Sequence, residues 1–292
     1  MSREDGQNLH TAHTYLRHTK KFPNVWCSGC GIGIVMGALI RAVDHLELSK
    51  DDVAVVSGIG CTGRMPVYLD FNTMHTTHGR ALAFATGLKL AQPRLHVIVV
   101  MGDGDALAIG GNHFIHAARR NIDLTAIVVN NSIYGMTGGQ YSPTTPQDFR
   151  ATTAPYGNIE QPLEVCKLAI AAGASFVARS TVYHAVELDR LIEQAIQKKG
   201  FGLVEAVSYC HTTFGRVNKL GSAVDMMQRI KENSITQASA EKLPPEERAT
   251  RIVRGVLWNE EKPEYLELYE RLIERVQQGN GTPSLSKEAA NA

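Results

Sequence analysis

The sequence predicts an α/β protein in which helices flank a mostly parallel sheet. Short apolar runs rich in valine, typical of strands buried on both faces, alternate with longer segments of helical periodicity. Helices that join such strands form βαβ units, which place the strands in parallel. The length of 292 residues and the hydrophobic content of 43% are enough for one large domain with a substantial core.

The predicted elements follow one another in regular order. Residues 33–46 repeat apolar side chains at helical spacing, and the valine-rich run 53–57 follows as a strand. Four further pairs of helix and strand are predicted at 79–91 and 95–101, 110–119 and 126–130, 162–172 and 174–179, and 185–198 and 203–208. Four of the five helices begin at glycine or proline, which are the usual boundary residues of such segments.

Composition divides the chain into four parts. Residues 1–21 are polar and rich in histidine, and 22–218 form the α/β domain. Amphipathic and charged segments predict a C-terminal helical arm over 219–280, with a solvated charged tail as the alternative. The small polar residues at 281–292 predict a disordered tail.

Charge and hydropathy argue against several classes of protein. The 30 Lys+Arg residues balance 29 Asp+Glu residues, so nothing electrostatic favours binding to nucleic acid or to an anionic membrane. No apolar run approaches the about 20 residues of a membrane-spanning helix. The polar N-terminus does not resemble a secretory signal. We therefore expect a cytoplasmic protein that binds neither nucleic acid nor membrane.

Two polar motifs follow predicted strands. Strand 95–101 leads into the Gly-Asp-Gly-Asp motif of residues 102–105, and strand 126–130 leads into Asn131. The carboxyl ends of parallel strands meet at one edge, so Asp103 and Asn131 are expected close together. Carboxylate and amide oxygens suit Mg²⁺, which takes its remaining ligands from phosphate and water. Glycines let the backbone approach a diphosphate closely, so the edge is predicted to bind Mg²⁺ and a diphosphate.

The five cysteines suggest a metal site. An odd number of thiols argues against a disulfide framework. Cys27 and Cys30 lie in a glycine-rich loop as a metal clamp or redox pair, and Cys61 and Cys210 follow strands at the edge expected to hold Asp103. Four converging thiolates could hold an iron–sulfur cluster or a structural zinc ion. The third and fourth cysteines are far apart in the sequence, whereas a zinc ribbon usually has two closely spaced pairs. The fifth, within helix 162–172, is expected to be a buried apolar residue.

The motifs together resemble a known family, the β subunits of 2-oxoacid:ferredoxin oxidoreductases. The resemblance covers residues 22–218 and is greatest to the 2-oxoglutarate members at residues 133–140. It is carried, in this order, by Cys-x-x-Cys-Gly from Cys27, Gly-Ile-Gly-Cys ending at Cys61, His-Gly-Arg at 78–80, Gly-Asp-Gly-Asp at 102–105, Asn-Asn at 130–131, Tyr-Gly-Met-Thr-Gly-Gly-Gln at 134–140 and the late Cys210. It implies a thiamine diphosphate-binding fold.

The resemblance also implies roles for individual residues. One [4Fe–4S] cluster would be ligated by Cys27, Cys30, Cys61 and Cys210, and Mg²⁺ by Asp103, Asn131 and the carbonyl of Ile133. Arg64 would bind the substrate carboxylate through its guanidinium. The residues implied to contact thiamine diphosphate are Ile59, Gly60, Cys61, Thr62, His78, Gly102, Asp103, Gly104, Asp105, Asn131, Gly135, Met136 and Thr137.

The implied reaction is the oxidative decarboxylation of 2-oxoglutarate with coenzyme A to succinyl-CoA and CO₂. Electrons would leave through the cluster to ferredoxin, and the reverse direction would fix CO₂. In this family, a glutamate from a separate pyrimidine-binding domain activates the cofactor. No second sheet domain is visible in this sequence to supply it, so an α subunit is expected to complete the site in an αβ or (αβ)₂ assembly.

Three alternatives remain open at this stage. The same chemistry could act on pyruvate or another 2-oxoacid. A thiamine diphosphate decarboxylase or synthase could carry structural zinc at the four thiolates. A non-catalytic iron–sulfur sensor is the third, but a sensor would not need the predicted diphosphate site.

Overall fold

The computed structural model describes residues 11–19 and 23–278. The sheet has eight strands in the order β2-β1-β3-β4-β8-β7-β10-β9. Neighbouring strands are parallel from β2 to β7, β10 pairs antiparallel with β7, and β9 pairs parallel with β10. The strands are β1 (Val53–Ser57), β2 (Asn72–His75), β3 (His96–Gly102), β4 (Thr125–Asn130), β7 (Phe176–Thr181), β8 (Gly202–Val207), β9 (Ser234–Thr236) and β10 (Ile252–Asn259), with β5 (Ile133–Tyr134) and β6 (Gln140–Tyr141) in a separate hairpin.

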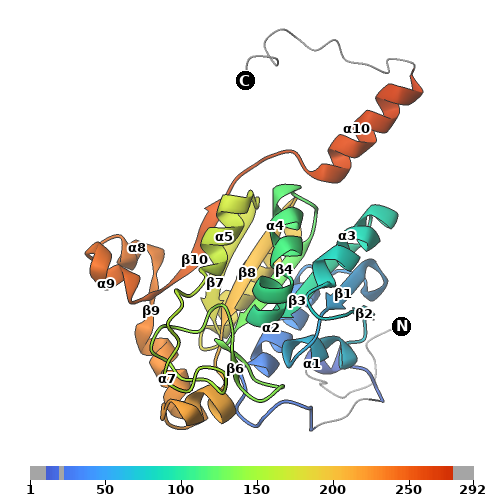
Figure 1. Cartoon of the computed structure of the whole chain (residues 1–292). Helices are drawn as coiled ribbons and strands as arrows, with labels where there is room; N and C mark the ends of the chain where they lie inside the picture. The colour runs from blue at the N-terminus through green and yellow to red at the C-terminus, as the bar shows by residue number, and fades with distance from the viewer. Residues whose placement is uncertain (1–10, 20–22, 279–292) are drawn as a thin grey trace.

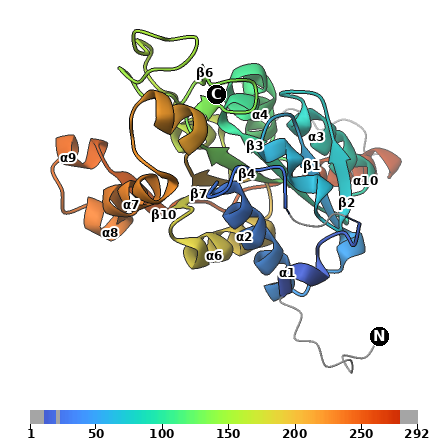
Figure 2. The same cartoon turned by 90° about the horizontal axis from the view of Figure 1, so that it is seen from below.

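Helices cover both faces of this sheet (Figure 2). One face packs against α2 and α6, and the other packs against α3, α4 and α5. The helices are α1 (Thr11–Thr14), α2 (Ile32–His45), α3 (Ala81–Ala91), α4 (Gly111–Arg119), α5 (Val165–Ala172), α6 (Ala185–Gln197), α7 (Ala223–Asn233), α8 (Gln237–Ala240), α9 (Pro245–Ala249) and α10 (Tyr265–Gln277). Short 3₁₀-helices lie at Lys50–Asp52 and Thr62–Val67, and short π-helices lie at Asp105–Ile109 and His211–Gly215.

The strand side chains alternate between two hydrophobic cores. On β1, Val53 and Val55 belong to the core under α2 and α6, whereas Ala54 and Val56 belong to the core under α3 and α4. Successive side chains of a strand point to opposite faces, so a strand covered on both faces is apolar throughout. This explains the continuous valine-rich runs and confirms the predicted α/β class.

All five predicted strands and five predicted helices form, with their ends shifted by at most three residues. The strand β2 was missed because its side chains are mostly exposed and polar. Among residues 11–19 and 23–278, no helix has the length and apolar character needed to cross a bilayer.

The C-terminal arm differs from the all-helical prediction. It contributes β10, which extends the main sheet by pairing with β7, and β9, which pairs with β10. The arm that begins at the predicted boundary, residue 219, therefore adds strands to the sheet of the α/β domain. In Figure 1, α10 extends away from the α/β body, and α8 and α9 project from its side. The predicted tail 281–292 lies outside the described residues.

The N-terminal segment is joined to the domain where it is described. Leu16 forms an isolated antiparallel bridge with Leu69, and the Arg17 side chain donates to the Leu69 carbonyl at 2.8 Å. Residues 1–10 and 20–22 of the predicted segment lie outside the described residues.

Candidate active site

One pocket at the carboxyl edge of the sheet brings the predicted cofactor residues together. It lies beyond the ends of β1, β3 and β4, whose following loops supply its walls. Its lining is Ile59, Gly60, Cys61, Thr62, His78, Gly102, Asp103, Gly104, Asp105, Asn131, Ile133, Tyr134, Gly135, Met136 and Thr137. Tyr134 is the one lining residue to which the sequence analysis assigned no role.

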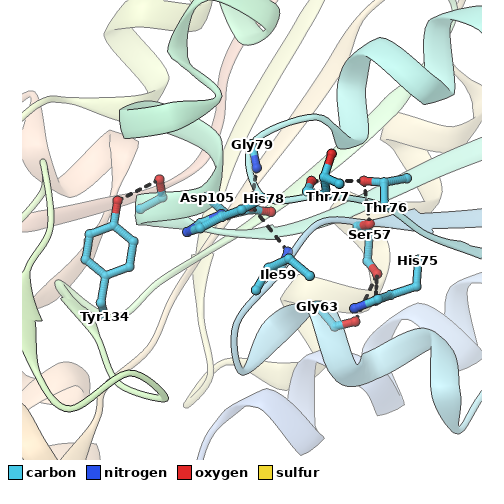
Figure 3. Close-up of polar contacts among 11 residues, drawn as sticks. Ser57, Ile59, Gly63, His75, Thr76, Thr77, His78, Gly79, Asp105 and Tyr134 are labelled. Carbon is cyan, nitrogen blue, oxygen red and sulfur yellow. Dashed lines mark hydrogen bonds and ion pairs between the residues drawn. The ribbon is translucent and has the colours of Figure 1, made fainter.

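Asp105 organises one wall of this pocket (Figure 3). Its Oδ1 lies 2.5 Å from His78 Nδ1 and accepts the backbone N–H of Gly79 at 2.7 Å. The more distant N–H of Ile59 also points to this oxygen, at 3.4 Å. The residue is only 2% exposed. With Nδ1 engaged, His78 has only Nε2 left for a ligand in the pocket.

The close packing at Asp105 requires glycine at position 58. A Cβ added to Gly58 would lie 2.1 Å from Asp105 Oδ2. That oxygen is buried and has no hydrogen-bond partner among the described residues.

Tyr134 closes the opposite side against the Gly-Asp-Gly-Asp loop. Its hydroxyl donates to the Gly104 carbonyl at 3.0 Å, and a Cβ on Gly104 would lie 2.3 Å from the tyrosine ring. Burial, together with the carboxylates of Asp103 and Asp105, raises the pKa of Tyr134 to about 12. The phenol is therefore a neutral donor. Its place beside Ile133 in the 133–140 motif was the available signal.

One of the predicted Mg²⁺ ligands, Asn131, has no hydrogen-bond partner for its amide oxygen among the described residues, which fits a cation. Asp103 Oδ2 accepts hydrogen bonds from Ser142 Oγ at 2.6 Å and from Thr144 Oγ1 at 2.5 Å. Burial raises the pKa of the Asp103 carboxyl, a cost that a bound cation would offset. Asn131 Oδ1 is enclosed but accepts no hydrogen bond from the described residues. An enclosed amide oxygen without a donor is costly unless something else occupies its lone pairs.

Four cysteines lie together immediately beside the pocket. Trp26 Nε1 donates to the Cys61 carbonyl at 2.8 Å, and this bond ties the loop of Cys27 and Cys30 to the loop after β1. Thr212 Oγ1 lies 3.7 Å from Cys27 Sγ and 3.6 Å from Cys210 Sγ. All five cysteines are free thiols.

Gly135 connects the thiols to the pocket. A Cβ on Gly135 would lie 3.3 Å from Cys210 Sγ and 3.8 Å from Cys61 Sγ. Gly135 and Cys61 also line the pocket itself. The two candidate sites therefore share a wall.

Two of the four thiols hold their protons more firmly than an ordinary cysteine does. Burial raises the pKa of Cys30 to about 11 and raises that of Cys61, so metal binding must displace thiol protons.

Comparisons with known proteins agree with this site. Residues 58–206 match the family model described as thiamine pyrophosphate enzyme, C-terminal TPP binding domain. The 2-oxoglutarate synthase subunit KorB of Methanocaldococcus jannaschii is 52% identical over 268 residues, which are 92% of this chain and 99% of that protein. The corresponding subunit of Archaeoglobus fulgidus is 57% identical over 219 residues, covering 75% and 79%.

A solved structure extends the match to the arm. It is a 2-oxoglutarate:ferredoxin oxidoreductase from Magnetococcus marinus with 2-oxoglutarate, coenzyme A and succinyl-CoA bound. It superposes with a TM-score of 0.81 at 32% identity, covering 97% of this chain and 94% of that one. The chain belongs to the β subunits of the 2-oxoglutarate:ferredoxin oxidoreductases.

Three further residues of the β subunit lie outside the pocket lining. Arg64 lies on the exposed side of the short helical turn after Cys61 and is not part of the pocket lining. His75, which had no assigned role, contacts Ser57 Oγ at 3.0 Å, and that hydroxyl holds the Gly63 carbonyl of the same turn. Cys166, on α5, is buried as predicted, and its thiol lies 3.2 Å from Glu205 Oε2.

Proposed function

We propose that the β subunit binds thiamine diphosphate with Mg²⁺ in this pocket, next to a [4Fe–4S] cluster held by Cys27, Cys30, Cys61 and Cys210. The observation that carries the proposal is the wall shared by pocket and thiols at Cys61 and Gly135. In the bound state the cofactor would supply an electron sink for loss of CO₂, and the cluster would accept electrons.

The residues of the β subunit would position these groups. Asp103, Asn131 and the Ile133 carbonyl would bind Mg²⁺, and the remaining ligands would come from diphosphate and water. Asp105 fixes the ring of His78 through Nδ1, which would leave Nε2 for a diphosphate oxygen. Tyr134 packs against the loop of Asp103 and Asp105 and donates a hydrogen bond to it.

The enzyme is a 2-oxoglutarate oxidoreductase, and the β subunit is one part of it. We propose that its net reaction converts 2-oxoglutarate and coenzyme A to succinyl-CoA and CO₂, and that two electrons pass one at a time to ferredoxin. Arg64 is proposed to bind the substrate carboxylate once the active site is assembled. Its exposure in the isolated subunit is consistent with a site completed by another chain.

We propose that an α subunit completes this site in an αβ or (αβ)₂ assembly. The helix α3 begins three residues after His78, which lines the pocket, so the N-terminal end of α3 lies near the pocket. Every exposed residue of α3 is uncharged, with Phe84 at 49% and Leu90 at 41% exposure. Exposed apolar surface of this kind favours a subunit contact. The β subunit alone is expected to be inactive, and activity from the isolated chain would contradict this.

The decisive measurement is iron and acid-labile sulfide per chain in protein purified without oxygen. About four of each would support the cluster. Zinc at the thiols, or no metal, would instead favour a thiamine diphosphate decarboxylase or synthase.

Two further experiments test the metal site and the substrate. Asp103→Ala should abolish retention of thiamine diphosphate, and unchanged cofactor content would exclude the assigned metal site. The ratio kcat/KM for 2-oxoglutarate, pyruvate and branched 2-oxoacids, measured side by side, tests the substrate assignment.

A further inference from the structure

A buried ion pair lies behind the candidate metal loop. Asn130, the last residue of β4, donates through Nδ2 to Glu205 Oε1 at 2.7 Å. Glu205 lies on the neighbouring strand β8 and is only 1% exposed. Its Oε2 accepts from Arg179 Nε at 2.6 Å, and Arg179 stands opposite Glu205 in the register of β7 and β8. Arg179 also pairs with Glu164 at 2.5 Å.

Asn130 connects this ion pair to the turn that holds Asn131. Its Oδ1 lies 3.3 Å from the backbone N–H of Ser132 and 2.9 Å from Thr144 Oγ1. Ser132 has a φ of 60°, in the left-handed region, and its carbonyl accepts from Thr145 Oγ1 at 2.7 Å. A side-chain oxygen bonded to the N–H two residues later closes a tight turn. Asn131 stands within that turn.

The carboxylate of Glu205 determines which way the Asn130 amide points. An ionised carboxylate only accepts hydrogen bonds, so it requires the NH₂ group of Asn130 on its side. The amide oxygen then necessarily faces the Ser132 N–H. The reverse orientation would bring two donors together at Ser132 and two acceptors together at Glu205. Burying a charge in an otherwise apolar strand is costly, and Arg179 supplies the counter-charge.

We propose that Glu205 is a positioning residue for the metal site. It acts through Asn130, whose side chain closes the turn that presents Asn131 Oδ1 to the cation. The inference rests on the Mg²⁺ site proposed above. It adds two residues, Glu205 and Arg179, that are remote from the pocket lining and were not assigned from the sequence.

Exchanging the donor and the acceptor tests this role. Asn130→Asp places two carboxylates against each other. In Glu205→Gln, the Gln amide must turn its oxygen toward the donor Arg179, and its NH₂ group then faces Asn130. The Asn130 amide is no longer held in its original orientation and can reverse. In the double variant the Gln amide donates to the new carboxylate, which still accepts from Ser132. Size and total charge are then the same as in the original pair.

The assembled enzyme is stripped of divalent metal and saturated with thiamine diphosphate. Binding of Mn²⁺ to this enzyme is then measured by EPR. Each single variant should raise the Mn²⁺ dissociation constant roughly tenfold or more. The double variant should return to within about threefold of the parent, a factor worth less than 1 kcal/mol. The proposal would be overturned if the single variants kept the parental Mn²⁺ affinity. It would also be overturned if the increase in dissociation constant of the double variant equalled the product of the two single increases.

Two controls separate the possible failures. Glu164→Gln removes the other partner of Arg179 without touching Asn130, and it should leave Mn²⁺ affinity unchanged. Equal weakening in that variant would mean that general destabilisation, not positioning, is measured. Asp103→Ala should abolish Mn²⁺ binding. If it does not, the metal site itself is wrong; if it does while Glu205→Gln has no effect, only the positioning role fails.

Discussion

Replacing Asp105 by asparagine should separate stability from cofactor binding. The substitution preserves the shape of a side chain that is 2% exposed and keeps one oxygen facing His78 and Gly79. It removes the charge. Hydrogen bonds to a charged group are worth about 1.5–3 kcal/mol and neutral ones about 0.5–1.5 kcal/mol. The two short bonds of Asp105 Oδ1, at 2.5 and 2.7 Å, should therefore weaken by about 1 kcal/mol each.

Removing the charge also relieves the cost of burying it. Asp105 Oδ2 has no partner among the described residues, and the penalty for an enclosed charge is several kcal/mol. The two effects oppose each other, so the free energy of unfolding should change by less than about 1 kcal/mol. The weaker hold on His78, about 1 kcal/mol, should lower thiamine diphosphate affinity about fivefold.

Isothermal titration calorimetry with thiamine diphosphate and thermal unfolding together test this prediction. The matched control is Asp189→Asn, which alters a carboxylate of 4% exposure that binds Arg41 at 2.7 and 2.9 Å, remote from the pocket. That variant should lose about 1–3 kcal/mol of stability and keep full cofactor affinity. Unchanged affinity in Asp105→Asn, or an equal loss in the control, would refute the role given to Asp105.

Three other predictions concern the cysteines. Burial raises the folded pKa of Cys30 to about 11 from 9.0, so the unfolded thiol ionises first. Stability of cluster-free protein should be complete below pH 9 and fall by up to about 2.7 kcal/mol by pH 11; urea unfolding measures this, and Cys30→Ser should flatten the profile. Gly135→Ala, which crowds Cys210 Sγ at 3.3 Å, should lower iron per chain, whereas Gly111→Ala, which meets no atom within 4 Å, should not. Cys166→Ala should leave the iron content per chain unchanged. A loss of iron in this variant would indicate that Cys166 is a cluster ligand.

The sequence was most informative where local pattern and sheet geometry agree. The run 53–57 is buried on both faces, so its composition alone predicts a strand, and β1 has the same bounds. Asp103 and Asn131 follow neighbouring parallel strands, β3 and β4. Parallel strands end at one edge, so residues that are distant in sequence meet there without any information about loops.

The sequence was least informative where an element depends on its neighbour. Residues 252–259 contain arginine and glycine within a charged segment, which does not resemble a buried strand. They form β10 because the edge of β7 offers unpaired backbone groups. A strand of this kind owes its structure to the partner edge, so it was predicted as part of a helical arm.

The sequence by itself determined the α/β class and the placing of Asp103 and Asn131 at one edge of the sheet. These follow from periodicities of two and 3.6 residues and from the common edge of a parallel sheet. The other predicted residues of the pocket lining were implied by the family resemblance. Only the tertiary structure decided that Tyr134 closes against Gly104, that Asp105 fixes His78, and that Glu205 reaches Asn130. Each of these contacts joins side chains from different loops or strands. Their partners depend on register, rotamer and packing, which no local pattern of residues encodes.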